Sequence, residues 1–128
     1  YPTAVLLTCQ HILQGLRYLS EQDVSFAITV TPFEFPVQRA VRLMPNQSLE
    51  MLHPEHEESR SQDLEEIYHD AGALYWGQPD AFCTGISFYG PRTRAIVLPR
   101  DRAIDIDTPA DLRVAEARSR ALSERSIE

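Results

Sequence analysis

The residues best suited to chemistry are the two aspartates of the segment Ile104–Pro109. Because side chains alternate along a strand, we expect Asp105 and Asp107 to leave a strand end pointing the same way. Two adjacent carboxylates are hard oxygen ligands for a divalent cation such as Mg²⁺. The segment also suits a helix start, since Asp107 or Thr108 would cap the helix and Asp111 would complete a capping box. Taken by itself, the motif favours capping over metal binding.

A second polar stretch, from Arg60 to Trp76, runs from charged and amide side chains into an apolar strand. Polar loops beside the strand ends of α/β sheets often line ligand crevices, so this stretch is a candidate site wall. A surface turn in which His69 and Asp70 pair with each other or cap a helix fits equally well. The nearby aromatic residues are expected in the core instead of forming a stacking surface: Tyr75, Trp76, Phe82, Phe88 and Tyr89.

The composition is that of an ordinary globular protein, with 128 residues, 43% hydrophobic and 24% charged. The net charge of −7 argues against a nucleic-acid partner, and no apolar run reaches the roughly 20 residues of a membrane helix. All 12 basic residues are arginine, so anions must be bound by guanidinium groups or backbone N–H groups. Cys9 and Cys83 lack metal-ligand spacing and are expected to be buried, reduced thiols of a cytoplasmic protein.

Helices and strands alternate along the chain, which predicts an α/β layered sheet within one domain, residues 1–128. Ile12, Leu13, Leu16 and Leu19 recur at helical spacing and predict a core-facing helix over 8–22. Alternating residues predict a strand over 24–31. The other expected elements are a helical turn at 61–68, strands at 72–76 and 94–98, a short helix at 79–84, and a helix at 108–123 with Leu112, Ala115 and Leu122 inside.

Two short alternating segments, 38–44 and 48–53, flank Pro45-Asn46-Gln47 and predict a β-hairpin. A hairpin buries little apolar surface by itself. We therefore expect the arm formed by residues 38–53 to need a partner.

Three motifs in this order carry a resemblance to a known family: Arg60-Ser61-Gln62-Asp63-Leu64, the segment Tyr68–Gly77, and the segment Ile104–Pro109. Together they resemble the acylneuraminate cytidylyltransferase family, over essentially the whole chain. His69-Asp70-Ala71 favours the branch that acts on pseudaminic acid, because sialic-acid relatives tend to have Arg-Pro-Asn before this glycine.

The resemblance implies a Rossmann-like nucleotidyltransferase sheet and a homodimer in which the hairpin arm reaches across to the partner. It implies a Mg²⁺-dependent reaction of CTP with a nonulosonic acid that gives the CMP-sugar, used in flagellin glycosylation, and pyrophosphate. Asp105 and Asp107 match the catalytic metal-binding pair. The residues that match the sugar site are Arg60, Gln62, His69, Tyr75, Thr3 and Ala4.

The chain departs from the family in one large respect. The family begins with a strand and a glycine- and arginine/lysine-containing loop that binds the CTP phosphates, whereas this chain opens on Tyr1-Pro2-Thr3, which is typical of a strand end. We therefore expect the C-terminal portion of an enzyme, inactive alone. The competing interpretations are a sialic acid cytidylyltransferase and a sugar-binding or dimerisation module without nucleotide chemistry.

Overall fold

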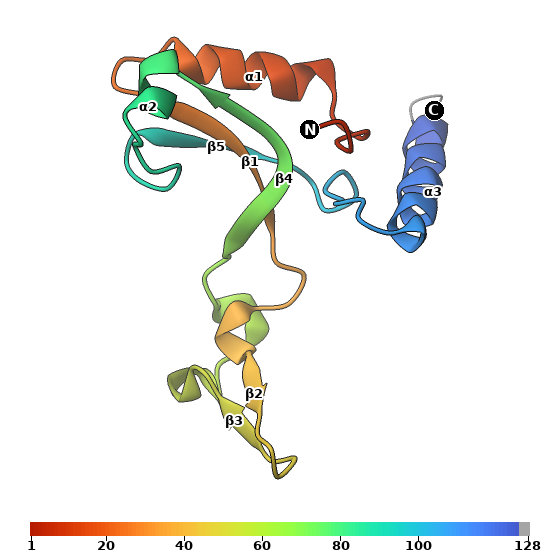
Figure 1. Ribbon diagram of the computed structural model, residues 1–128. Helices are drawn as coiled ribbons and strands as arrows, with labels where there is room; N and C mark the ends of the chain where they lie inside the picture. The colour runs from red at the N-terminus through yellow and green to blue at the C-terminus, as the bar shows by residue number, and fades with distance from the viewer. Residues whose placement is uncertain (126–128) are drawn as a thin grey trace. The chain divides into compact units, whose positions relative to one another are not determined.

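The computed structural model describes residues 1–125. Its strand β1 (Phe26–Pro32) is the middle strand of a three-stranded sheet, between β4 (Tyr68–Gly77) and β5 (Thr93–Val97) (Figure 1). β5 runs parallel to β1. β4 runs the other way, because Ser25 is joined to Gln78 and Thr29 to Leu74. The prediction of an α/β fold is thus confirmed as a small mixed sheet with helices.

The chain divides into two compact units. One unit contains Tyr1–Thr31 and the chain from Asp70 onward, and the other contains Pro32–His69. The expectation of one domain over residues 1–128 stays a prediction.

Both faces of β1 are buried, as its apolar residues and small residues lead one to expect. Ala27 packs on one face in a cluster that includes Ile96 and Leu98. Phe26 and Ile28 pack on the other face with Ala81. This second face adjoins the candidate functional site, because Tyr75 and Ile86 pack against its cluster.

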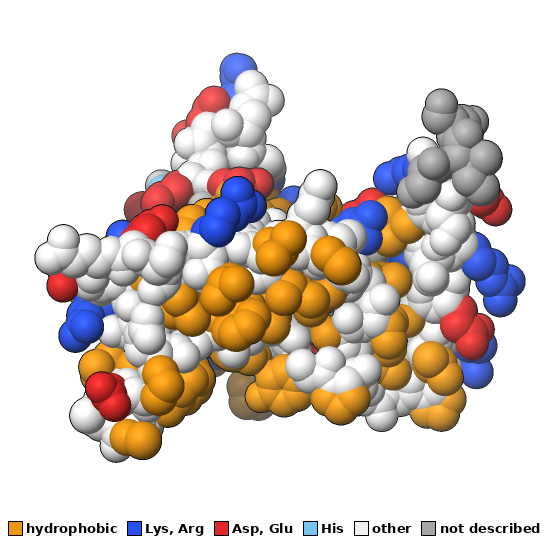
Figure 2. Space-filling view, turned by 90° about the horizontal axis from the view of Figure 1, so that it is seen from above, with side chains coloured by type: hydrophobic (Ala, Val, Ile, Leu, Met, Phe, Trp, Pro, Cys, Tyr) orange, Lys and Arg blue, Asp and Glu red, His pale blue; other side chains and the backbone are white. Residues whose placement is uncertain are grey.

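The helix α1 (Cys9–Leu19) meets the sheet through its one buried residue, Gly15. A Cβ atom at Gly15 would lie 2.2 Å from Cδ1 of Trp76, so only glycine allows this approach. The prediction that Ile12, Leu13 and Leu16 face the core is wrong, since they are 41%, 55% and 53% exposed. The view onto α1 accordingly shows hydrophobic side chains gathered at the surface (Figure 2).

The helices of the C-terminal half match their predicted positions, as α2 (Pro79–Cys83) and α3 (Pro109–Arg125). Ala115 is buried as expected, but Leu112 is 48% exposed. Both cysteines are free and exposed, which corrects the prediction of buried thiols. Within residues 1–125, no helix has the length and apolar character needed to cross a membrane.

The unit Pro32–His69 contains the predicted hairpin in a shorter form, as β2 (Val41–Leu43) and β3 (Leu49–Met51). Gln38 belongs instead to the 3₁₀ helix η1 (Val37–Arg39), and its side chain donates to the carbonyl of Glu65 at 3.0 Å. Two further 3₁₀ turns are η2 (Pro54–His56) and η3 (Ser61–Asp63). The predicted helical turn at 61–68 is shorter, since η3 ends at Asp63 and β4 begins at Tyr68.

Candidate functional site

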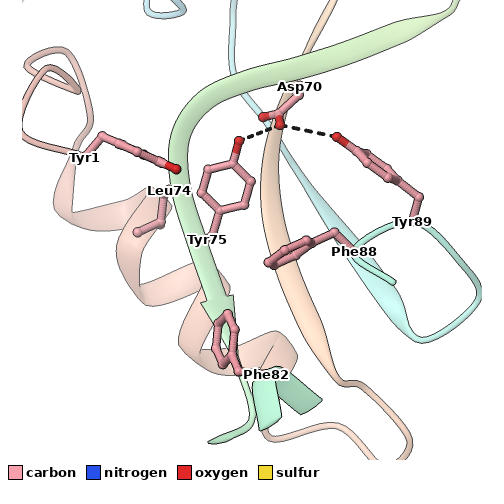
Figure 3. A pocket seen from close by; sticks show the side chains of 7 residues that line it. All are labelled: Tyr1, Asp70, Leu74, Tyr75, Phe82, Phe88 and Tyr89. Atoms are coloured by element: carbon pink, nitrogen blue, oxygen red, sulfur yellow. Dashed lines mark hydrogen bonds between the residues drawn. The ribbon is translucent and has the colours of Figure 1, made fainter. Parts of the chain in front are cut away.

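An aromatic pocket of about 550 Å³ lies within the first unit (Figure 3). Its lining combines apolar rings with one carboxylate: Tyr1, Asp70, Leu74, Tyr75, Phe82, Phe88 and Tyr89. Pockets that bind small molecules are commonly apolar with a few placed polar groups, and this pocket has that character.

Four segments supply these side chains, and the N-terminal segment provides Tyr1. β4 provides Asp70, Leu74 and Tyr75; α2 provides Phe82, and the segment before β5 provides Phe88 and Tyr89. The rings support one another edge to face, with the centroid of Tyr75 5.7 Å from Phe88 and 5.5 Å from Tyr1.

Buried Phe26 of β1 underlies this arrangement, with its centroid 4.6 Å from Phe88 and 5.2 Å from Phe82. Two walls of the pocket therefore pack directly on a core residue of the sheet.

Asp70 holds the polar edge of the pocket. The hydroxyls of Tyr75 and Tyr89 both donate to its Oδ2, the latter at 3.3 Å (Figure 3). The N–H of Gly72 donates to its Oδ1 at 2.8 Å. A carboxylate held in this way offers acceptor oxygens beside rings that cover apolar groups. The pocket thus suits a ligand with both N–H or O–H donors and apolar groups.

The same arrangement keeps both phenols protonated. Burial raises the pKa of Tyr75, and its hydrogen bond to Asp70 raises it further. The negative charge of Asp70 is the main cause of the raised pKa of Tyr89. Both tyrosines are consequently hydrogen-bond donors at neutral pH.

The predicted metal pair, Asp105 and Asp107, does not leave a strand end, which corrects the expectation from the sequence. β5 ends at Val97, a turn follows, and the segment 103–107 belongs to no strand. The turn reorients the chain, so strand alternation does not govern where these aspartates point. Both are exposed.

Helix capping does not use either of these carboxylates. The carboxylate of Asp111 accepts from the backbone N–H of Thr108 at 2.8 Å and from its hydroxyl at 2.7 Å. The Thr108 hydroxyl in turn accepts the N–H of Asp111 at 3.3 Å, which completes a reciprocal cap of α3. The hydrogen bonds to Thr108 lower the pKa of Asp111.

Asp105 and Asp107 fit a Mg²⁺ site chemically. Mg²⁺ is commonly held by one or two carboxylates, together with waters and substrate phosphates. Within residues 1–125, neither carboxylate forms a hydrogen bond or ion pair, so both are available as oxygen ligands. No group of three or more His, Cys, Asp and Glu side chains in this described part could hold a metal, so any ion here needs ligands beyond them.

The other predicted site residues divide between the two units. Tyr75 lines the pocket, and Thr3 and Ala4 lie in a turn next to Tyr1, whose amino group donates to the carbonyl of Ala73 at 3.1 Å. Ala4 packs against the core.

Arg60, Gln62 and His69 belong to the unit Pro32–His69. All three are exposed, and the His69 ring lies 4.7 Å from the ring of Phe33.

Several pocket residues were missed from the sequence. Asp70 accepts hydrogen bonds from Tyr75 and Tyr89, which the sequence did not predict, and Tyr89 is 67% exposed instead of buried. Phe82 and Phe88 are also partly exposed, at 50% and 36%. The sequence signal for these residues was the aromatic pair Phe88-Tyr89 beside Gly90, but such a pair is equally typical of a hydrophobic core.

Among known proteins, this chain resembles cytidylyltransferases, a class of nucleotidyltransferase. No family model matches the chain. Pseudaminic acid cytidylyltransferases from two strains of Campylobacter jejuni are each 39% identical over 116 residues, which is 91% of this chain and 50% of the relative. The chain therefore spans about half the length of these curated relatives.

A protein of Helicobacter pylori is 28% identical over 126 residues, 98% of this chain and 24% of that protein. It is named pseudaminic acid cytidylyltransferase and UDP-2,4-diacetamido-2,4,6-trideoxy-beta-L-altropyranose hydrolase. These names agree with the resemblance read from the motifs, and with the branch that His69-Asp70-Ala71 favours.

Proposed function

We propose that this chain forms the sugar-facing and metal-binding part of a cytidylyltransferase that transfers CMP from CTP to pseudaminic acid. The observation that carries the proposal is the 39% identity to pseudaminic acid cytidylyltransferases over 91% of the chain. The pocket supports it, because rings beside an acceptor carboxylate suit the acylamino groups of a nonulosonic acid.

In the proposed reaction, the anomeric hydroxyl of the sugar attacks the α-phosphorus of CTP. A phosphorus–oxygen bond to the sugar forms, the bond to pyrophosphate breaks, and the hydroxyl proton is released. Asp105 and Asp107 would hold Mg²⁺, which supplies neutralisation of phosphate charge. Tyr75 and Asp70 would orient the sugar. By the family resemblance, Arg60 would contact a sugar carboxylate, and Gln62 and His69 would belong to the wall of a sugar site, whether in their own copy or across the dimer.

The proposal extends to the assembly and its setting. We take the sheet as part of a Rossmann-like nucleotidyltransferase fold, and the hairpin β2–β3 as a contact between two copies. Leu43 and Leu49 of this hairpin are 61% and 67% exposed, which favours an apolar partner surface. We place the reaction in the cytoplasm, where CTP is made, and its product in flagellin glycosylation.

The test is a comparison of the full-length encoded protein with the 128-residue chain. Each is incubated with CTP, Mg²⁺ and either pseudaminic acid or N-acetylneuraminic acid, and CMP-sugar and pyrophosphate are measured. We expect product from the full-length protein with pseudaminic acid, and none from the 128-residue chain. Equal rates with N-acetylneuraminic acid would contradict the assigned substrate.

The half-length match to the relatives favours one second candidate, a sugar-binding or dimerisation module without nucleotide chemistry. Calorimetry of the full-length protein separates the two functions. A module would bind the sugar but show no Mg²⁺-dependent binding of CTP.

A further inference from the structure

We infer that Thr29, which does not line the aromatic pocket, is a positioning residue that fixes the part of β4 between Asp70 and Tyr75. The inference rests on the proposed function for its effect on the sugar, and on the geometry of β1 and β4 for its mechanism. Thr29 lies in the middle of β1 and is fully buried.

The hydroxyl of Thr29 makes three contacts with the neighbouring strand. It donates to the carbonyl of Leu74 at 3.2 Å, and it accepts the N–H groups of Leu74 at 2.9 Å and Ala73 at 3.3 Å. A hydroxyl has one donor and two acceptor sites, so all of its capacity is used. No apolar side chain of the same shape can replace these bonds.

These contacts fall where β4 departs from a regular strand. Gly72 has φ +62°, a left-handed conformation typical of a bulge, and its N–H donates to Asp70. Three successive backbone N–H groups of β4, those of Gly72, Ala73 and Leu74, therefore donate to side-chain oxygens. The local path of β4 depends on two side chains, Asp70 and Thr29.

The path of β4 decides the geometry of the pocket. Asp70 precedes this irregular stretch and Tyr75 follows it, yet the Tyr75 hydroxyl reaches back to Asp70 (Figure 3). Leu74, whose backbone Thr29 holds at both N–H and carbonyl, lines the same pocket. Loss of the Thr29 hydroxyl would free this stretch and separate the two polar residues.

The neighbouring threonine of the same strand provides a matched control. Thr31 is also buried, at 3% exposed, but its hydroxyl has no hydrogen-bond partner within residues 1–125. Substitution of either threonine by valine exchanges a hydroxyl for a methyl group of similar size. Only at Thr29 does the exchange remove contacts with β4.

The test uses Thr29→Val, Thr29→Ser and Thr31→Val in the full-length encoded protein. We expect Thr29→Val to raise KM for pseudaminic acid about tenfold, with kcat and KM for CTP changed by less than about twofold. Thr29→Ser and Thr31→Val should match the wild type. A pseudaminic acid KM unchanged in Thr29→Val, or raised equally in Thr31→Val, would overturn the inference.

A second readout does not depend on activity. The ionisation of Tyr75 is followed by NMR, with its signals assigned from Tyr75→Phe. In Thr29→Val the pKa of Tyr75 should fall, because the ring loses burial and its contact with Asp70, whereas Thr31→Val should leave it unchanged.

If Thr29→Val does not fold, Thr29→Ala and Thr29→Ser are compared in the same titration, and equal pKa values of Tyr75 would refute positioning by the hydroxyl. If the wild type transfers no CMP, the proposed function fails while this titration still decides the inference about Thr29.

Discussion

Asp70 joins two tyrosine hydroxyls at one edge of the aromatic pocket. Its carboxylate also accepts the N–H of Gly72, so one residue links the backbone of β4 to two pocket walls. Because charged acceptors make stronger hydrogen bonds than neutral ones, the negative charge is the property that matters at this position. A substitution that removes the charge of Asp70 therefore tests the hydrogen bonds of the pocket directly.

We expect Asp70→Asn to lower the pKa of both tyrosines. The pKa of Tyr75 should stay above its ordinary value, since burial is the larger cause, whereas the pKa of Tyr89 should lose most of its rise, since the charge of Asp70 is the main cause there. The wild type should lose stability as pH rises above 10, because only the unfolded phenols then ionise, and the variant should lose less.

Phenolate absorbance measured against pH checks this prediction, with Asp80→Asn in α2 as the control for an aspartate outside the pocket. Identical titrations of Asp70→Asn and the wild type would contradict it.

At the scale of elements, one carboxylate at the start of α3 caps the helix, and two carboxylates just before it do not. Asp111 caps the helix together with Thr108, whereas the carboxylates of Asp105 and Asp107 have no hydrogen bond or ion pair within the described residues. Capping thus falls on Asp111, whereas the metal binding that we propose would fall on Asp105 and Asp107.

We expect Asp107→Asn to lower kcat about a hundredfold at saturating Mg²⁺, with unchanged helix content, because it would remove one of the two anionic ligands that we propose for the ion. Asp111→Asn should do the reverse and reduce helix content with little change in kcat. The cap by Asp111 should be lost as pH falls below its ordinary pKa near 3.8, since its folded pKa is lowered.

Kinetics and circular dichroism of both variants measure these effects. Full activity of Asp107→Asn would remove the support for a metal site.

The bend of β4 at Gly72 gives a second prediction at this scale. Gly72→Ala should cost about 1–2 kcal/mol of unfolding free energy, because φ is +62° there. Gly85→Ala is a matched control, since Gly85 has φ +68° and open space around it. Denaturant unfolding should show similar losses for both variants, and only Gly72→Ala should also weaken sugar binding. Equal sugar binding by both would show that the bend is irrelevant to the pocket.

At the scale of the whole molecule, the hairpin exposes apolar side chains on both strands, including Leu43 and Leu49. The ion pair between Arg42 and Glu50, at 3.2 Å, lies in the same hairpin and is also exposed. Exposed ion pairs contribute little to stability. The apolar side chains are therefore the better candidates for a contact between two copies.

If the homodimer forms through this hairpin, Leu49→Asp should shift the full-length protein from dimer to monomer in sedimentation velocity. The charge would be buried against the partner, whereas the fold of one copy should survive because Leu49 is 67% exposed. Glu50→Gln should remain dimeric. A Leu49→Asp variant with the sedimentation of a wild-type dimer would exclude the hairpin as the contact.

The sequence by itself determined the order and type of the elements. Helical periodicity predicted α1, alternation predicted β1 and the hairpin, and the threonine–proline start predicted α3. These features arise from interactions between residues close in the chain. The family resemblance, read from three motifs, was likewise borne out by relatives at 39% identity.

The tertiary structure alone decided which side chains meet. Gly15 is the residue of α1 that meets the sheet, because a side chain there would collide with Trp76, and the apolar residues Ile12, Leu13 and Leu16 are exposed. Thr29 and Leu74 are 45 positions apart, and Asp70 and Tyr89 are 19 apart. Contacts of this range depend on how strands pair and bend, and no local pattern of residue types records them. The pocket therefore could not be predicted from the sequence, because it depends on β1 and β4 lying side by side.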